Sequence, residues 1–398
     1  MHIKTKSINS ESNIIMNINS KKILVVGAGF AGACYSRTLA EAGFEVDVID
    51  KRSHIGGNAF DFINENGIRV HKYGPHLFHT SNLRVMRWLS RFSEWTPYTH
   101  RVRALLPNKQ FVPIPINIDT IKTVFGKNFK DPSEAEQFIM RLGENYKNIN
   151  NAADYLYSKI GKELTELFFR PYTEKMWAAN LEEMDASVIK RIPIRFDGED
   201  RYFPNDIYQA LPSNGYDNLF ASIFSHENIK IQLRMEFDKK IEKEYIHIFN
   251  SMSIDEYFNY SFGHLPYRSI KFHHRNEKKL TQHVWATTNF TDMGPFTRET
   301  CWDVLPNNCK IDNGIYAVTS EEPCDYLENE MERYYPVKTA DGANEKLYEL
   351  YKRMASDHGR ITFIGRCGTY QYLNMDQVIN QSLLGAHNWI EKMSHNKA

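Results

Sequence analysis

Residues 22–50 read KILVVGAGFAGACYSRTLAEAGFEVDVID, and this stretch predicts the fold. The run at 22–26 is apolar and rich in β-branched residues, which is typical of a strand buried on both faces. A helix is expected from Ala33 to Ala42 and a second strand at 44–49. Strand, helix and strand in this order form a βαβ unit. The sequence therefore predicts an α/β fold with a Rossmann-like domain.

The turn after the first strand carries the pattern Gly-x-Gly-x-x-Gly. Gly27 permits the tight turn, Gly29 lets backbone approach a pyrophosphate, and Gly32 lets the helix pack closely on the strand. Asp50 lies 18 residues after Gly32, where its carboxylate would accept hydrogen bonds from a ribose diol. The unit predicts dinucleotide binding, and a glycine-rich turn in an unrelated sheet is the alternative.

Two features favour FAD as the dinucleotide. The carboxylate of Asp50 disfavours a 2′-phosphate, and therefore NADP, at this position. Gly56 and Gly57 follow soon after the acid, a pattern common in flavoproteins that leaves room for backbone beside the phosphates. By this analogy the sequence favours FAD over NAD.

Composition excludes several classes of protein. The 398 residues hold 49 basic and 49 acidic side chains, so no generally basic surface for nucleic acid is expected. No run reaches the ~18 apolar residues of a membrane span, and residues 1–21 form a polar extension that is not a secretory signal. Five scattered cysteines without a Cys-x-x-Cys pair indicate a reducing compartment. We expect a soluble, cytoplasmic protein with no nucleic-acid partner.

The segment 71–80 holds three histidines but no carboxylate at metal-ligand spacing, so no metal site is predicted. Histidines satisfied by their neighbours are the simplest interpretation of this segment. The chain also shows no Ser-His-Asp set and no pair of carboxylates that would indicate side-chain catalysis.

From about residue 22 to 385 the chain resembles the UDP-galactopyranose mutase family. After the Gly-x-Gly-x-x-Gly turn, the motifs that carry the resemblance follow in order: DKRSHIGGNA (50–59), HKYGPHLFHT (71–80), YTEKMW (172–177), KRIPIRF (190–196), YRSIKF (267–272), NFTD (289–292) with Thr297-Arg298, YYPV (334–337), and Gly365-Arg366 with Tyr372. One such motif would be weak evidence, but the whole set in order is specific.

The resemblance implies a flavin-dependent isomerase. Its substrate would be a nucleotide-diphosphate sugar, first of all UDP-galactopyranose, which is converted between pyranose and furanose forms without net redox change. Reduced FAD would act as the nucleophile by forming an adduct between flavin N5 and sugar C1, with NAD(P)H or another reductant as a transient electron donor. The resemblance also allows a homodimer.

The resemblance assigns site residues in three groups. Cofactor contacts fall to Gly27, Gly29, Phe30, Ala31, Gly32, Asp50, Lys51, Asn58, His76, Leu77, Arg366, Met375, Asp376, Gln377 and Val378. Substrate contacts fall to His100, Tyr172, Thr173, Trp177, Tyr202, Asn289, Tyr335, Tyr372 and Asn374. Catalytic roles fall to Arg191, Arg298 and His79, with both arginines on the diphosphate and His79 near the flavin edge. A permanently charged, bidentate guanidinium suits a diphosphate better than an ammonium does. Arg191 would lie on a mobile loop at 180–197.

Three departures from the family pattern lie at the sugar end. His100 stands where Asn is usual, Asn374 where Asp is usual, and Pro75 where a small residue is usual. A mutase acting on a deoxy, N-acetylamino or pentose sugar attached to UDP or dTDP is therefore an alternative. An FAD amine oxidase-like oxidoreductase is an alternative of another class, because it shares the first βαβ unit.

The expected architecture places the FAD-binding domain at both ends of the chain, in 22–85 and 340–398. A helical insertion at 117–187 would line the substrate cleft. A smaller antiparallel sheet domain would use 86–116 and 188–339, with a partial return to the FAD domain. The last helix, expected from Met375 to Trp389, would direct its N-terminus at the flavin.

Overall fold

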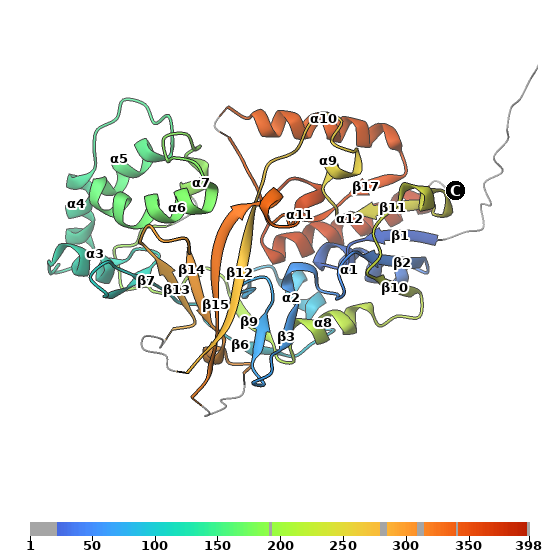
Figure 1. The fold of residues 1–398 in the computed structure, drawn as a ribbon, viewed down its shortest axis with the longest axis horizontal. Helices are drawn as coiled ribbons and strands as arrows, with labels where there is room; N and C mark the ends of the chain where they lie inside the picture. The colour runs from blue at the N-terminus through green and yellow to red at the C-terminus, as the bar shows by residue number, and fades with distance from the viewer. Residues whose placement is uncertain (1–21, 191–192, 279–284, 309–313, 340, 396–398) are drawn as a thin grey trace, which may run out of the picture.

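The computed structural model describes residues 22–190, 193–278, 285–308, 314–339 and 341–395 (Figure 1). The predicted βαβ unit is confirmed as β1 (Lys22–Val26), α1 (Phe30–Glu41) and β2 (Glu45–Asp50). Helix α1 begins three residues earlier than expected, because Gly29 rather than Gly32 is its N-cap. The Rossmann-like α/β fold is thereby confirmed.

Five parallel strands form the first sheet, in the order β10-β2-β1-β11-β17. The three strands outside the βαβ unit are β10 (Ile229–Leu233), β11 (His247–Asn250) and β17 (Ile361–Phe363). These segments are far apart in the chain, yet every strand pair in the sheet is parallel. All five carboxyl ends therefore meet at one edge, which is where open α/β sheets bind ligands.

Both faces of this sheet are buried. Ile23 and Val25 belong to a core shared with α1, α8 (Gly215–Phe224) and α12 (Met375–His395). Leu24 and Val26 face a second cluster that includes Tyr257 of α9 (Ile254–Tyr257). Helix α10 (Ala343–His358) packs against α9 and β17. Alternate residues of one strand thus serve opposite cores, which explains the uninterrupted apolar run in the sequence.

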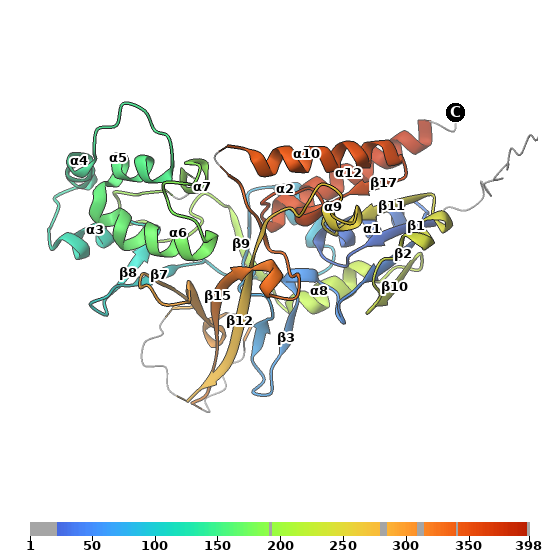
Figure 2. The ribbon, with the colours of Figure 1, turned by 45° about the horizontal axis from the view of Figure 1, so that its top comes forward.

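A seven-stranded sheet stands beside the Rossmann-like unit (Figures 1 and 2). Its order is β16-β12-β15-β14-β13-β7-β8, and only the β13–β7 pair within it is parallel. The bounds are β7 (Val102–Leu105), β8 (Phe111–Ile114), β12 (Tyr267–Glu277), β13 (Thr287–Phe290), β14 (Arg298–Cys301), β15 (Tyr316–Asp325) and β16 (Tyr335–Pro336).

A helical unit covers the far end of this sheet (Figure 2). It contains α3 (Ile118–Phe125), α4 (Pro132–Leu142), α5 (Ala152–Leu164), α6 (Arg170–Trp177) and α7 (Ser187–Lys190). The side chains of Asn117, Asp131 and Asn151 cap the first three of these helices, as their residue types favour. A π-helical turn at Thr165–Phe169 joins α5 to α6.

Short elements connect these units. They are β3 (Asp61–Ile63), β4 (Arg69–His71), β5 (Phe78–Thr80), α2 (Leu83–Leu89), β6 (Trp95–Pro97), β9 (Tyr208–Pro212) and α11 (Gly365–Gly368). Strands β5, β9 and β6 form a small antiparallel sheet, and β3 pairs with β4. Among the described residues no helix is both long and apolar enough to cross a bilayer.

Asp61 ties β3 to β4 and α8. Its fully buried carboxylate accepts hydrogen bonds from Arg69 Nη1 at 3.0 Å, from the backbone N–H of Tyr216 at 2.7 Å and from that of Asp217 at 3.0 Å. The second and third bonds satisfy donors in the first turn of α8, which no preceding helical carbonyl can reach. Asp61 therefore closes a network in which each buried group has a partner.

We expect Asp61→Ala to lower the free energy of unfolding by about 3–5 kcal/mol, because the Arg69 charge loses its buried carboxylate and two backbone N–H groups lose their acceptor. Urea unfolding of the purified protein, followed by circular dichroism, measures this change. Asp217→Ala is the matched control. Its carboxylate also pairs with Arg69 but is 38% exposed, so it should cost about 1 kcal/mol or less. Equal losses in the two variants would contradict the role given to Asp61.

Candidate active site

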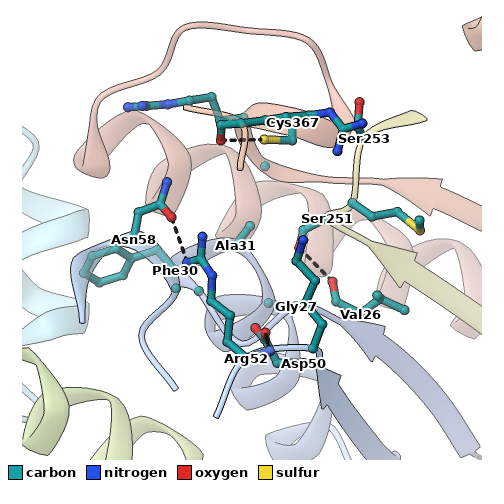
Figure 3. A pocket seen from close by; sticks show the side chains of 18 of the residues that line it. Val26, Gly27, Phe30, Ala31, Asp50, Arg52, Asn58, Ser251, Ser253 and Cys367 are labelled. Carbon is teal, nitrogen blue, oxygen red and sulfur yellow. Dashed lines mark hydrogen bonds between the residues drawn. The ribbon is translucent and has the colours of Figure 1, made fainter. Parts of the chain in front are cut away.

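A cavity of about 530 Å³ opens at the carboxyl ends of the parallel strands (Figure 3). The glycine turn after β1 and Asp50 at the end of β2 line one side, and Ser251 after β11 lines another. Residues 365–367 of α11 close it from the C-terminal part of the chain. The topology thus brings four distant segments to one site.

The glycines make this cavity possible by close packing. Gly27 has φ +99°, and a Cβ there would lie 1.9 Å from Ser251 Oγ. A Cβ on Gly32 would lie 1.9 Å from the Gly27 carbonyl oxygen. A Cβ on Gly57, which has φ +55°, would lie 2.9 Å from Gly29 Cα. The two glycine turns therefore contact each other through their backbones. Only glycine, which has no Cβ, permits so close an approach.

The N-terminus of α1 points its free donors at this cavity. Gly29 caps the helix without a side-chain hydrogen bond, and the first turn contains no acidic residue. Phe30, Ala31 and Gly32 of that turn line the cavity. Unpaired N–H groups and the helix dipole together favour a phosphate at this point. The arrangement fits the pyrophosphate of a dinucleotide.

Asp50 is held at the cavity wall by two backbone donors. Oδ2 accepts from the N–H of Ala28 and Oδ1 from the N–H of Arg52, each at 2.8 Å. An ionised carboxylate has about four lone-pair positions, so two remain for further donors. Its place at the end of β2 suits a ribose diol, as the sequence predicts.

Arg52 was not among the predicted site residues, although it lines the same cavity. Its Nη1 donates to Asn58 Oδ1 at 2.8 Å, and its guanidinium pairs with Glu332 and lies 4.3 Å from the ring centre of Tyr73. Glu332 belongs to a segment, 330–333, that also lines the cavity. Lys51 lines it with a half-exposed side chain.

Other cavity residues escaped prediction because they come from remote strand ends. Residues 235–237 follow β10, and residues 251–253 follow β11. The available signal was weak. Both segments follow short strands and mix polar with apolar residues, and only the sheet order reveals that these strands flank β2 and β1.

At the C-terminal side, His76, Arg366, Met375 and Val378 line the cavity. His76 Nδ1 lies 2.9 Å from the Gly74 carbonyl oxygen, and burial lowers the pKa of His76 to about 3, so the ring is neutral. Arg366 Nη1 donates to the Tyr334 carbonyl oxygen at 3.1 Å. Met375 begins α12, so this helix directs its N-terminus at the cavity.

Three predicted cofactor residues lie beside this cavity and not among its described lining residues. Leu77 packs against the main core. Asp376 Oδ2 accepts from Thr80 Oγ1 at 2.9 Å, which ties α12 to β5. Gln377 Oε1 accepts from the backbone N–H of Asn374 at 2.8 Å.

Arg298 occupies the neighbouring region, at the start of β14. Its Nε lies 2.8 Å from Oε2 of Glu321, a carboxylate that is only 1% exposed on the adjacent strand β15. Burial alone would lower the pKa of Arg298, and the Glu321 charge outweighs it and raises that pKa. The guanidinium is therefore a fixed cation. Asn289 lies opposite Arg298 on β13.

An aromatic wall surrounds this cation. Tyr335 and Tyr372 stack with ring centres 5.3 Å apart, and Trp177 meets Tyr335 edge-on at 6.4 Å. Tyr172 joins the same cluster, while Thr173 on α6 is buried. Burial raises the pKa of Tyr335 to about 12, so its hydroxyl remains a donor. The Arg366 guanidinium lies 5.1 Å from the Tyr372 ring centre and links the wall to the cavity.

Histidines and aromatics form the remaining side. His79 Nδ1 lies 2.6 Å from Asp206 Oδ2, and the His79 ring stacks on Phe203 at 3.5 Å. His100 lies 5.4 Å from Tyr202, ring centre to ring centre. Burial lowers the pKa of His100 to about 3, and the Arg298 charge acts in the same direction.

Two predicted site residues remain, Asn374 for the sugar and Arg191 for the diphosphate. Asn374 is exposed, just before α12. Arg191 lies outside the described residues, so its predicted place on the diphosphate stays a prediction.

Within the described part of the chain, no three His, Cys, Asp or Glu side chains are grouped so that they could hold a metal ion.

Comparison with known proteins bears on this site. Residues 167–372 match the UDP-galactopyranose mutase family, and residues 25–92 match NAD(P)-binding Rossmann-like domains. The chain is 36% identical to a probable UDP-galactopyranose mutase of Klebsiella pneumoniae, with 95% of this chain and 97% of that protein covered. It is 33% identical to the dTDP-fucopyranose mutase of Escherichia coli, with 93% and 98% covered.

Among solved structures, a reduced UDP-galactopyranose mutase matches with a TM-score of 0.72 at 16% identity, covering 93% of this chain and 94% of that one. A putative protoporphyrinogen oxidase of Exiguobacterium sp. 255-15 matches with a TM-score of 0.64 at 11% identity, covering 94% and 99%. At these identities the structures show a shared fold alone. The sequence relatives decide the matter, and the chain belongs to the UDP-galactopyranose mutase family.

Proposed function

We propose that this protein isomerises the sugar ring of a nucleotide-diphosphate sugar between pyranose and furanose forms, with UDP-galactopyranose and UDP-galactofuranose as the first pair. The observation that carries the proposal is Arg298, a fixed cation held on buried Glu321 between aromatic side chains. The Arg298 side chain is 27% exposed, and a partly exposed guanidinium can bind a diphosphate by bidentate, charge-assisted hydrogen bonds.

The aromatic wall supplies the remaining recognition. Tyr335 keeps its hydroxyl as a donor beside the Arg298 charge, and Tyr372 stacks on the Tyr335 ring. Tyr172 and Trp177 offer flat faces for a pyrimidine base. Arg191 would add a second guanidinium from the neighbouring loop. The contact between Arg366 and Tyr372 supports a substrate position next to the dinucleotide cavity. Substrate and cofactor would therefore share one boundary.

FAD is the cofactor that we assign to this cavity. The N-terminus of α1 would hold its pyrophosphate and Asp50 its ribose, while His76, Arg366 and the N-terminus of α12 would border its ring system. Reduced FAD supplies a nucleophile, N5, for the anomeric carbon of the sugar. NAD(P)H or another reductant would provide its electrons, and the reaction would leave the substrate's oxidation state unchanged.

Two observations favour a test of a second sugar substrate. A dTDP-fucopyranose mutase is 33% identical over nearly the whole chain, and His100 and Asn374 depart from the residues usual at the sugar end. Loss of a carboxylate at 374 suits a sugar with fewer hydroxyl donors, such as a 6-deoxy sugar. An amine oxidase-like activity is the weaker alternative, since it has no use for the Arg298 site. Cytoplasmic location and a homodimer stay predictions.

The deciding experiment incubates dithionite-reduced holoenzyme with a panel of UDP- and dTDP-sugars and follows each by mass-balanced chromatography. We expect one nucleotide sugar to convert into an isomer of equal mass, only when the enzyme is reduced. Stoichiometric oxygen consumption with an altered substrate mass would instead identify an oxidase. The same panel separates galactose from 6-deoxy substrates.

Arg298→Ala should lower turnover by at least about 100-fold, since the diphosphate loses a buried charge partner. Arg298→Lys keeps the charge without the bidentate geometry, so its turnover should lie between that of Arg298→Ala and that of the wild type. FAD content, read from the flavin absorbance, should not change in either. Arg191→Ala should behave as Arg298→Ala does. Near-normal turnover in either alanine variant would remove that arginine from the assigned role.

Gly32→Ala should weaken FAD binding by about tenfold or more, because its methyl group would meet the Gly27 carbonyl oxygen and displace the turn. FAD occupancy after gel filtration measures the effect. Gly198→Ala is the matched control, since a Cβ at Gly198 meets nothing within 4 Å. Full occupancy in both variants would show that the tight turn does not form the cofactor site.

A further inference from the structure

His79 lies in a closely defined environment that the diphosphate and cofactor contacts do not use. It is the middle residue of β5, between Phe78, which is buried in the main core, and Thr80, which donates to Asp376 at the start of α12. The backbone of His79 pairs with Gln209 of β9. Three elements therefore fix the main chain at this point.

The imidazole ring is fixed as firmly as the main chain. Phe203 stacks on one face of it, with ring centres 3.5 Å apart and planes 9° from parallel. Asp206 Oδ2 lies 2.6 Å from Nδ1. The His79 side chain is 14% exposed and that of Asp206 is 28% exposed. The ring can neither flip nor rotate without losing the stack or the hydrogen bond.

This geometry decides which nitrogen carries the proton. An ionised carboxylate can only accept hydrogen bonds, so the short contact requires a proton on Nδ1. In a neutral ring Nε2 is then an acceptor, and it is directed away from Asp206. Among the described residues Nε2 has no hydrogen-bond partner. Its neighbours include His100, which shares the Phe203 ring with His79 and lies near Arg298.

A ring interconversion needs a proton carrier at such a place. When the C1–O5 bond breaks, its electron pair leaves with O5, which must take up a proton. When a lone pair of O4 then forms the C1–O4 bond, O4 must release its proton. One proton is taken up and one is released, so a single imidazole that gives and then accepts balances the whole exchange.

We propose that His79 is this proton carrier and that Asp206 is the positioning residue that holds it in the Nδ1–H form. The inference rests on the proposed function, because it concerns the same sugar. His79 in its protonated form gives the Nε2 proton to O5 and regains one from the O4 hydroxyl. Asp206 stabilises the imidazolium before the first step and after the second, and it keeps Nε2 of the neutral ring directed at the sugar between them.

The first test is Asp206→Asn in the reduced holoenzyme. An asparagine can donate to Nδ1 and so favours the Nε2–H tautomer. In that tautomer Nε2 already carries a proton and cannot accept one from the sugar hydroxyl. We expect turnover to fall by about 100-fold or more, with KM and UDP affinity within threefold of wild type. Asp206→Glu keeps a carboxylate and should recover most of the lost turnover. FAD occupancy should be the same in all three proteins.

Ser81→Ala is the matched control for loop structure. Ser81 Oγ bonds the Asn205 carbonyl oxygen and the Ile207 backbone N–H, on either side of Asp206. It also donates a long hydrogen bond of 3.4 Å to Asp206 Oδ1, which is not the oxygen that contacts His79. If Asp206 merely supports its loop, Ser81→Ala and Asp206→Asn should lose similar turnover. We expect Ser81→Ala to stay within threefold of wild type.

A double-mutant cycle with His79→Ala tests whether Asp206 acts through the histidine. In the His79→Ala background, Asp206→Asn should lower turnover no further. If Asp206 had a purely structural role, Asp206→Asn would lower turnover by the same factor in both backgrounds. Nitrogen-15 spectra of histidine-labelled protein provide a readout independent of activity. The His79 signals, identified by their loss in His79→Ala, should report Nδ1–H in wild type and Nε2–H in Asp206→Asn.

The outcomes separate the two proposals. If wild-type enzyme converts no nucleotide sugar, the proposed function fails, and the spectra still judge the tautomer. If wild type is active, then any of three results overturns the inference: turnover of Asp206→Asn within threefold of wild type, equal factors in both backgrounds of the cycle, or an unchanged tautomer. If Asp206→Asn does not fold, the tautomer of His79 in the wild type and the turnover of Asp206→Glu test the inference instead.

Discussion

The contact between two glycine turns is the constraint on which the rest of this structure depends. Gly27, Gly32 and Gly57 bring backbone to within distances that no side chain would permit. This contact seats α1 on the sheet, clears the end of the helix for a phosphate, and leaves Asp50 beside it. Every other wall of the cavity is placed relative to that turn. The glycines are needed here because they allow close backbone contact, and not because they make the chain flexible.

The Arg298–Glu321 pair sets the second condition for function. Burying a carboxylate almost completely is costly unless a cation is close, and burying that cation is costly unless it is paired. The pair lets the protein hold a positive charge among tyrosines with only 27% of the Arg298 side chain exposed to solvent. A charge in such surroundings attracts a diphosphate more strongly than one on the open surface would. In the proposed function, Glu321 would therefore act on the substrate through Arg298.

The sequence predicted the local units well and the distant contacts poorly. The βαβ unit was predicted because its glycines, apolar run and acid are contiguous, and the family motifs identified Arg298 and Tyr335. Ser251 was missed because its place depends on sheet order, which no local pattern contains. Arg52 and Glu332 were missed because their pairing joins segments 280 residues apart. The expected domain boundaries and the roles of the individual site residues stay predictions.

The order of the strands in the parallel sheet also has a consequence for biosynthesis. Its edge strand β17 and the long helix α12 come from the last tenth of the chain, yet they pack directly against β11 and α1. Such sequence-distant pairing is slow to form and exposes apolar surface while it waits. During translation β1, β2 and β11 must therefore persist without their closing strand until the segment that forms β17 has been synthesised.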